Sequence, residues 1–343
     1  MKKLLNTLFV TTDGAYIRKK HETLVVEIER KPVLRLPLVS ICNINCFGRV
    51  NMSPSFMHHC AGLGIGIAFF NTYGRFLARV QGPKSGNVLL RRQQYRLADD
   101  LEHSADIARF IIAAKVANSR SVLKRAIRNN PDNAEAKALE TATRELSSCM
   151  KNLAKTIHLD SLRGIEGGAA SSYFNVFNHL IIKQKDGFAF RERNRRPPKD
   201  TVNAMLSFVY SVMLQDCVSA LEGVGLDPYV GFLHRDRPGR QSLALDLEEE
   251  FRSVLADRLV LSMINLKQVK ASEFTMSENG AVLLGDKLIK KILTEYHNRK
   301  QKEVLHPVIK ERLQIGLLFH VQASLLARHI RGDMDYYPAY IWR

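Results

Sequence analysis

The sequence is poor in cysteine, and we expect none of its hydrophobic stretches to cross a membrane. Its five cysteines are an odd number without the spacing of a disulfide framework, so we expect a reducing, cytoplasmic location rather than secretion. Lys2 and Lys3, followed by LLNTLFV, imitate a signal peptide, but Asn6 and Thr7 interrupt the apolar run. No run approaches about eighteen apolar residues, so we expect no membrane-spanning segment and no membrane partner.

Acidic side chains are also scarce relative to basic ones. The chain of 343 residues has 51 lysines and arginines against 34 aspartates and glutamates, a formal net charge of +17 and a pI near 9.8. Such an excess favours a polyanionic partner, nucleic acid before membrane, because binding phosphates releases counterions. The alternative is an ordinary soluble protein that happens to be basic. The length predicts two domains, and 45% hydrophobic residues are enough for sizeable cores.

The first part of the chain, residues 1–96, is predicted to form a small β-sandwich-like domain. Short β-branched runs alternate with turn residues such as Asp13-Gly14 and Lys31-Pro32, as is typical of a meander of strands. The expected strands cover residues 7–12, 15–20, 23–29, 33–38, 39–44, 66–71 and 75–81.

From residue 97 to residue 343 the apolar period lengthens from two to between three and four, which predicts a larger all-α domain. One hairpin signal interrupts it, with Asn279-Gly280 at the turn. The fold class is therefore α+β. The expected helices cover residues 99–127, 131–156, 161–182, 200–222, 242–263, 286–299 and 308–331.

One segment of the helical part combines an imidazole with carboxylates. His234 precedes Glu249 by fifteen residues, and Asp246, Glu249 and Glu250 have the spacing that places them on one face of a helix. Carboxylate oxygens and one imidazole nitrogen suit Mg²⁺ or Mn²⁺. Because clustered carboxylates repel DNA phosphates unless a cation intervenes, this cluster is unexpected in a cationic chain and is the main clue to function.

Three glycines around Glu166 interrupt another helical pattern. Gly164, Gly167 and Gly168 each cost about 1 kcal/mol relative to alanine in a helix. They are tolerated where another backbone or a ligand approaches closely. Two interpretations remain open here: tight packing of two helices with Glu166 in water, or the approach of a ligand beside Glu166.

A basic loop stiffened by Pro197-Pro198 precedes the helix expected from residue 200. Guanidinium groups bind phosphates bidentately, and the prolines lower the cost of ordering the loop, which favours a binding role over a merely solvated loop. The basic residues of this loop are Arg191, Arg193, Arg195, Arg196 and Lys199.

Together these segments resemble a known family. GIEGGAASSYF, RNRRPPKDTVNAMLSFVYS, GFLH and LALDLEEEFR are similar, in order and spacing, to the CRISPR-associated integrase that captures new spacers, the Cas-one family. The resemblance covers residues 163–258, about the middle of the helical part. The N-terminal strands fit the β domain of that family but carry no diagnostic motif.

The resemblance implies a metal-dependent DNA endonuclease and integrase with one set of site residues. Glu166, His234 and Glu249 are implied as catalytic ligands of Mg²⁺ or Mn²⁺. The residues expected beside them are Asp246, Glu250 and Arg252, and those expected to bind DNA are Arg163, Arg193, Arg195, Arg196 and Lys199.

The resemblance also implies the reaction and the partners. Members of the family join the 3′-hydroxyl ends of captured double-stranded DNA to a CRISPR repeat by transesterification, as homodimers bridged by a small adaptation partner, Cas-two. We expect residues 1–96 to form the homodimer, because two-fold symmetry supplies two sites for two DNA ends. Apolar positions that favour such an interface are Leu8, Val10, Ile17, Val25 and Phe70.

Other functions remain open. A stand-alone metal-dependent nuclease for branched or single-stranded DNA would use the same three ligands. A non-catalytic DNA-binding protein would carry the acidic cluster merely as a helix face. A metallopeptidase is disfavoured, because the H-E-x-x-H spacing is absent from the sequence.

Overall fold

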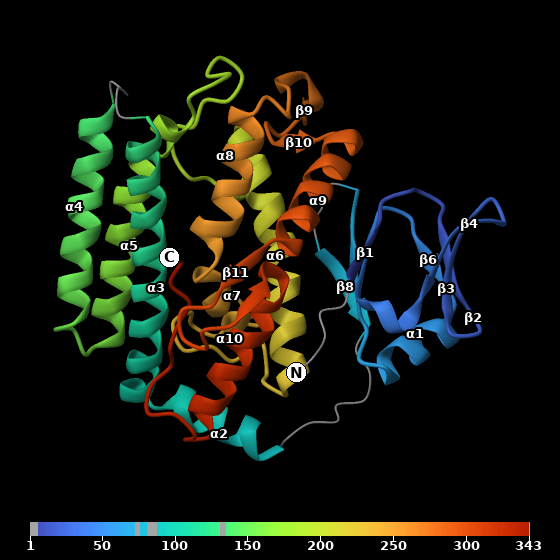
Figure 1. Ribbon diagram of the computed structural model, residues 1–343, viewed down its shortest axis with the longest axis horizontal. Coiled ribbons are helices and arrows are strands. Elements are labelled where there is room, and N and C mark those ends of the chain that lie inside the picture. The colour runs from blue at the N-terminus through green and yellow to red at the C-terminus, as the bar shows by residue number, and fades with distance from the viewer. Residues whose placement is uncertain (1–5, 73–75, 81–87, 131–134, 343) are drawn as a thin grey trace. The chain divides into compact units, whose positions relative to one another are not determined.

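The structure, a computed structural model, describes residues 6–72, 76–80, 88–130 and 135–342 (Figure 1). The chain folds as two compact units. The first contains Met1–Gly86 with Leu284–Lys302 and Gln314–Leu317, and the second contains Asn87–Leu283, Glu303–Leu313 and Leu318–Arg343. N-terminal sheets followed by a mostly helical region confirm the predicted α+β class. Helix α9 (Asp286–Gln301), predicted from its apolar period, belongs to the first unit together with the sheets.

Two four-stranded sheets make up most of the first unit. Between strands β5 (Ile41–Phe47) and β7 (Gly66–Phe70) the chain forms helix α1 (Pro54–Gly62). The sequence analysis missed this helix, although Ser53 caps it and Pro54 opens it. This crossover lets β5 and β7 pair in parallel, whereas a meander consists of antiparallel neighbours. The predicted meander is formed by β2 (Tyr16–Lys20), β3 (Thr23–Ile28) and β4 (Lys31–Pro37). One sheet has the order β1 (Asn6–Val10), β5 (Ile41–Phe47), β7 (Gly66–Phe70), β8 (Phe76–Val80), and the other β4 (Lys31–Pro37), β3 (Thr23–Ile28), β2 (Tyr16–Lys20), β6 (Asn51–Met52).

The apolar positions predicted to favour a dimer interface lie mostly inside this unit. Val10 and Ile17 are 5% and 0% exposed and belong to the core cluster, and Leu8 packs against it. Val25 and Phe70 are 1% and 0% exposed. These side chains stabilise the folded chain by burial and are not free to bind a second copy.

The second unit is built from long helices. α3 (Leu101–Asn129) packs against α4 (Ala136–Leu153) and α5 (Leu159–Asn175), and these two also contact each other (Figure 1). The side chains of Asp100 and Asp200 accept hydrogen bonds from backbone N–H groups at the starts of α3 and α6 (Thr201–Val224). The remaining elements are α2 (Val88–Asp99), α7 (Ser242–Glu249), α8 (Arg258–Asn265), α10 (Ile315–Ile330), the predicted hairpin β9 (Phe274–Met276) and β10 (Val282–Leu284), and the pair β11 (Glu303–Leu305) and β12 (Arg312–Gln314).

Helix α6 is long and apolar enough, by length and composition, to cross a membrane. Of its most apolar stretch, 78% is buried inside the structure. Such burial is typical of the central helix of a protein core, where apolar side chains face other helices on all sides.

Three predicted helices differ from those observed. The helix expected over residues 161–182 ends at Asn175 and is followed by a 3₁₀ turn, η2 (Phe177–Leu180). The helix expected over residues 242–263 is interrupted after Glu249 by a π-helical segment, η3 (Arg252–Asp257), before α8 begins. The helix expected from residue 308 begins only at Ile315. There, His306 Nδ1 accepts hydrogen bonds from the backbone N–H groups of Val308 and Ile309, and this local alternative competes with a helical turn.

Candidate active site

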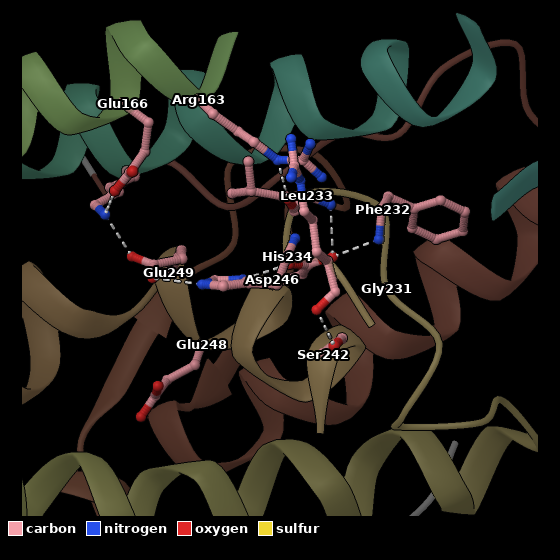
Figure 2. Close-up of polar contacts among 12 residues, drawn as sticks. Arg163, Glu166, Gly231, Phe232, Leu233, His234, Ser242, Asp246, Glu248 and Glu249 are labelled. Carbon is pink, nitrogen blue, oxygen red and sulfur yellow. Dashed lines mark hydrogen bonds and ion pairs between the residues drawn. The ribbon is translucent and has the colours of Figure 1, made fainter. Parts of the chain in front are cut away.

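Three segments of the second unit bring two carboxylates and one imidazole together. Glu166 lies in the middle of α5, His234 in the loop before α7, and Glu249 at the end of α7. Figure 2 shows the side chains of Glu166 and Glu249 pointing toward the same space, with His234 between Asp246 and Glu249. His234 Nε2 lies 3.9 Å from Glu249 Oε1. The three predicted ligands therefore form one cluster.

Asp246 fixes the loop that carries His234. Its carboxylate is fully buried and accepts hydrogen bonds from the backbone N–H groups of Phe232 (2.7 Å), Leu233 (3.0 Å) and His234 (3.0 Å). His234 Nδ1 lies 2.7 Å from Asp246 Oδ1. A carboxylate at Nδ1 favours a proton on that nitrogen, so the lone pair of Nε2 is directed toward Glu249.

Gly231 makes this arrangement possible. A Cβ atom at this position would lie 2.8 Å from Ser242 and 2.9 Å from Asp246 Oδ2, far inside contact distance. Only glycine lets the loop pass this close to the start of α7. The motif GFLH thus begins with a residue that the packing requires.

Lys115, on α3, lies between two of the acidic side chains. Its ammonium group contacts Glu166 and is 2.8 Å from Glu249 Oε2. Burial lowers the pKa of Lys115, but Glu249 and Glu166 raise it by more, so the net pKa lies above the ordinary value. Lys115 therefore carries a full positive charge at the point where the two carboxylates meet.

The spacing of the cluster is set by this ammonium group. Among the residues that the structure describes, no three His, Cys, Asp or Glu side chains have the spacing of a metal-bound group. Lys115 lies between Glu166 and Glu249, and His234 Nε2 is separated from Glu249 by a gap longer than a hydrogen bond.

Arg252 supplies a second buried cation. Its guanidinium group is 2.6 Å from Glu248 Oε2 and also contacts Glu249, while its plane lies over the ring of Tyr210. Burial raises the pKa of Glu249, but the buried cations Arg252 and Lys115 offset this and hold it below the ordinary value. Glu249 is consequently ionised and available to a cation at neutral pH. The predicted pairing of Arg252 with the acidic cluster matches this geometry.

Glu250, predicted to accompany these residues, faces another direction. Its carboxylate accepts hydrogen bonds from Tyr337, Tyr340 and Gln322, and none of these belongs to the acidic cluster. The helix predicted over residues 242–263 ends as an α-helix at Glu249, so the expected alignment of Glu250 with Asp246 on one face is wrong.

The glycines beside Glu166 do not serve helix packing. A Cβ atom at Gly164, Gly167 or Gly168 would meet nothing within 4 Å, and all three residues are exposed. Of the two interpretations left open, tight helix packing is therefore excluded for the folded chain. The surface next to Glu166 lacks side chains and leaves room for a ligand to approach.

The basic residues of the loop before α6 have different roles. Arg193 is held inside, where it donates hydrogen bonds to Asn203 Oδ1 (2.6 Å) and Ser207 Oγ (3.2 Å). Burial lowers the pKa of Arg193. Arg195, Arg196 and Lys199 are exposed. Phosphate binding is therefore expected from these three side chains, whereas Arg193 is committed to the fold.

Two hollows adjoin the cluster. Arg195 lines a small one together with Lys115, Glu166 and Glu249. A larger cleft of about 770 Å³ reaches His234 from the other direction and is bordered by Arg163 and Arg235. Arg163 donates a hydrogen bond to the Leu233 carbonyl (2.8 Å) and pairs with Asp160 (2.8 Å), so it also supports the histidine loop.

The sequence analysis missed Lys115 and Glu248. Lys115 is a single lysine in the apolar run FIIAAKVA, a position where an unpaired charge is unfavourable. The sequence therefore shows that Lys115 is an unusual charge, but it does not show that Glu166 and Glu249 are its partners. Glu248 looked like one acidic residue among three, yet it is 1% exposed and paired with Arg252.

Comparison with known proteins places the chain in a family. The family model described as "CRISPR associated protein Cas1" matches residues 8–298. A protein of Chlorobaculum tepidum named "CRISPR-associated endonuclease Cas1 1" is 49% identical over 343 residues, covering all of both chains. A protein of Rhodospirillum rubrum named "CRISPR-associated endonuclease Cas1 2" is 48% identical over 347 residues, again covering both chains fully.

Solved structures agree on the fold. A Cas1 protein from Thermotoga maritima has a TM-score of 0.81 at 23% identity, covering 97% of this chain and 99% of that one. A casposase bound to its integration product has a TM-score of 0.85 at 22% identity, covering 99% and 95%. Identities this low support the architecture alone. The match of the family model over residues 8–298 and the two relatives near one-half identity show that the chain belongs to the CRISPR-associated Cas1 family.

Proposed function

We propose that this protein is a metal-dependent DNA endonuclease and integrase that inserts short foreign DNA into a CRISPR array. The observation that carries the proposal is the convergence of Glu166, His234 and Glu249 on one cluster in a chain of net charge +17. The curated relatives near one-half identity are named endonucleases. The casposase with the same fold is described as bound to an integration product.

The donor set of the cluster fits Mg²⁺ or Mn²⁺. Glu166 and Glu249 offer carboxylate oxygens, and His234 offers Nε2 because Nδ1 is engaged by Asp246. Glu249 Oε2 is a buried carboxylate oxygen. The ammonium of Lys115 stands 2.8 Å from it and takes the place of a cation between the carboxylates. Hard oxygen ligands with one imidazole are the set that these ions accept.

Glu166, His234 and Glu249 would hold the ion, and the remaining residues of the cluster would position the reactants. When bound, a divalent cation would activate the attacking oxygen and neutralise charge on the phosphorus. Asp246 keeps the His234 imidazole in one orientation, and Arg252 keeps Glu249 ionised and fixed in place. Exposed Arg195, Arg196 and Lys199 would bind the DNA phosphates near the cluster. Catalysis then depends on positioning and charge stabilisation.

We also propose double-stranded DNA and a small adaptation protein, Cas2, as partners, with two copies of this chain in the assembly. Complexes described as containing Cas1 and Cas2 share its fold. Four of the five apolar residues first expected at a dimer interface are buried, so we propose that an exposed strand edge forms the interface instead. Strand β4 lies at the edge of its sheet and exposes Val33 (55%) and Leu34 (38%).

The experiment uses the purified chain, a supercoiled plasmid carrying a CRISPR repeat, and a short duplex with 3′-hydroxyl ends. We expect joining of the duplex to the plasmid in Mg²⁺ or Mn²⁺, enhanced by the Cas2 partner and abolished by EDTA. A duplex ending in 3′-deoxynucleotides should not be joined, because the attacking oxygen is missing. Glu166→Ala, His234→Ala and Glu249→Ala should each abolish joining while leaving DNA binding largely intact.

Other outcomes of this experiment favour the remaining functions. Metal-dependent cleavage without joining, even with the partner present, would favour a stand-alone nuclease. DNA binding with neither cleavage nor metal binding would favour a non-catalytic DNA-binding protein, and the acidic cluster would then be structural.

A further inference from the structure

The helix that carries the acidic cluster is irregular directly after Glu249. α7 ends there, and the π-helical segment η3 begins at Arg252. Such wide turns occur mostly as short interruptions of α-helices, frequently at functional sites. They persist where surrounding structure supplies partners for the displaced backbone and side chains. In this chain the interruption covers residues 250–257, so it begins directly after Glu249 and includes Arg252.

Glu250, inside this interruption, is held by the C-terminal segment. Its side chain is 0% exposed. It accepts hydrogen bonds from Tyr337 Oη (2.5 Å), the Tyr340 backbone N–H (2.6 Å) and Gln322 Nε2 (2.9 Å). Three donors on one carboxyl group fix its direction, because leaving any of these buried groups without its partner costs free energy.

The orientation of Gln322 is fixed in turn by His306. His306 Nδ1 accepts hydrogen bonds from the backbone N–H groups of Val308 and Ile309, so the proton of this imidazole lies on Nε2. Nε2 lies 3.0 Å from Gln322 Oε1 and donates a hydrogen bond to it, which turns the Gln322 amide NH₂ toward Glu250. The network is therefore directional from His306 to Glu250.

Asn118, on helix α3, makes hydrogen bonds both to the irregular turn after Glu249 and to the C-terminal segment. It is 0% exposed, and its Nδ2 donates to the carbonyl oxygens of Glu250 (2.7 Å) and Tyr340 (2.8 Å). Its Oδ1 accepts a hydrogen bond from the Trp342 backbone N–H (2.8 Å). Asn118 lies almost one turn beyond Lys115 on α3, so a single helix carries both Asn118 and the ammonium that bridges Glu166 and Glu249.

We propose that residues 334–342 are a positioning segment for the acidic cluster, and that Asn118 and Glu250 are the positioning residues through which they act. By holding the interrupted turn from the side remote from the cluster, they fix the direction of Glu249 and Arg252. None of these contacts involves Glu166 or His234, so the effect on the site is indirect. The expected effect on metal binding rests on the proposed function. The expected effect on the stability of the turn after Glu249 does not.

The test uses the full chain with Tyr337→Phe or Asn118→Ala, and Leu139→Ala as a matched control. Leu139 is 0% exposed in α4 and shares no hydrogen bond with Asn118 or Glu250, so its replacement destabilises the second unit by a cavity alone. Two quantities are measured below the unfolding temperature: the Mn²⁺ dissociation constant by calorimetry, and hydrogen exchange of residues 249–257 without metal.

We expect Tyr337→Phe and Asn118→Ala to weaken Mn²⁺ binding about tenfold, the scale of changes to groups that support metal ligands. Exchange of residues 249–257 should accelerate in both variants and stay unchanged in Leu139→Ala, and raised Mn²⁺ should restore activity. A lower melting temperature with unchanged Mn²⁺ affinity and unchanged exchange would overturn the proposal and leave a structural role only. If the parent chain binds no Mn²⁺, the metal-dependent function fails, and the exchange measurement still decides whether the segment positions the turn.

Discussion

His234 Nδ1 lies 2.7 Å from Asp246 Oδ1, and the same carboxylate accepts the backbone N–H groups of residues 232 to 234. One buried side chain thus holds both the loop and the imidazole on it. We expect Asp246→Asn to weaken Mn²⁺ binding by about tenfold to a hundredfold, because an amide NH₂ cannot replace an acceptor oxygen of that carboxylate. Calorimetric titration with Mn²⁺ measures this change. Unaltered affinity would show that His234 is held by other contacts or does not bind the ion.

Lys115 and the metal should compete for the same carboxylates. In Lys115→Met the metal-free protein should lose about 3 kcal/mol of stability, because Glu166 and Glu249 lose the buried cation between them. Mn²⁺ should then raise the melting temperature of Lys115→Met more than that of the parent chain, since no ammonium has to be displaced. Lys115→Arg, which keeps the charge, is the control. Equal metal-induced shifts in the parent and Lys115→Met would contradict competition at this site.

The exposed residues Arg195, Arg196 and Lys199 should contribute to DNA binding without reading sequence. Their combined replacement by alanine should reduce the slope of log K against log salt concentration by about one unit for each phosphate that the variant no longer binds. A control with the same charge change replaces Lys183, Lys185 and Lys267, which are exposed elsewhere in the second unit. Filter binding or fluorescence anisotropy over a series of salt concentrations gives the slopes. Equal slopes for the two triple variants would remove the loop from the DNA path.

Asp257 should make stability depend on pH. Burial raises its pKa from 3.8 to about 6, although Tyr210 and Tyr173 donate hydrogen bonds to it. The folded state therefore binds the proton more tightly than the unfolded state, so the contribution of Asp257 is fully present below pH 3.8 and is lost as pH rises through about 6. Relative to Asp257→Asn, the parent should lose about 1 kcal/mol between about pH 5 and pH 7.5. Thermal or urea unfolding of both proteins at the two pH values measures the difference, and a constant difference would contradict the raised pKa.

The edge strand β4 should take part in self-association. Val33 and Leu34 are exposed on it, and replacing both by lysine should weaken a dimer without disturbing the core. Sedimentation of the parent and the variant measures this change. A control variant, Leu63→Lys, places a charge on an exposed apolar residue elsewhere in the N-terminal unit. If both variants sediment like a dimeric parent, the interface lies elsewhere.

Local patterns in the sequence predicted much of the fold. Alternating β-branched residues indicated the N-terminal strands, and the apolar period indicated the helices near residues 99–127 and 200–222, observed as α3 and α6. Helix α1 was missed because the surrounding strand signals outweighed its Ser53-Pro54 start. The helix expected from residue 308 began late because the side chain of His306 captures two backbone N–H groups, which periodicity does not reveal.

By itself, the sequence placed His234 near Glu249 by spacing, and its resemblance to the Cas1 family implied Glu166 as their companion. Only the tertiary structure decided how their neighbours act. Lys115 pairs with Glu166 and Glu249 because helices distant in sequence pack together, and no local pattern encodes such a pairing. The tertiary structure also decided that Arg193 points inward and that Glu250 points to the C-terminal segment. The direction of a side chain depends on the exact phase of its helix or loop, and the π-helical interruption after Glu249 changes that phase.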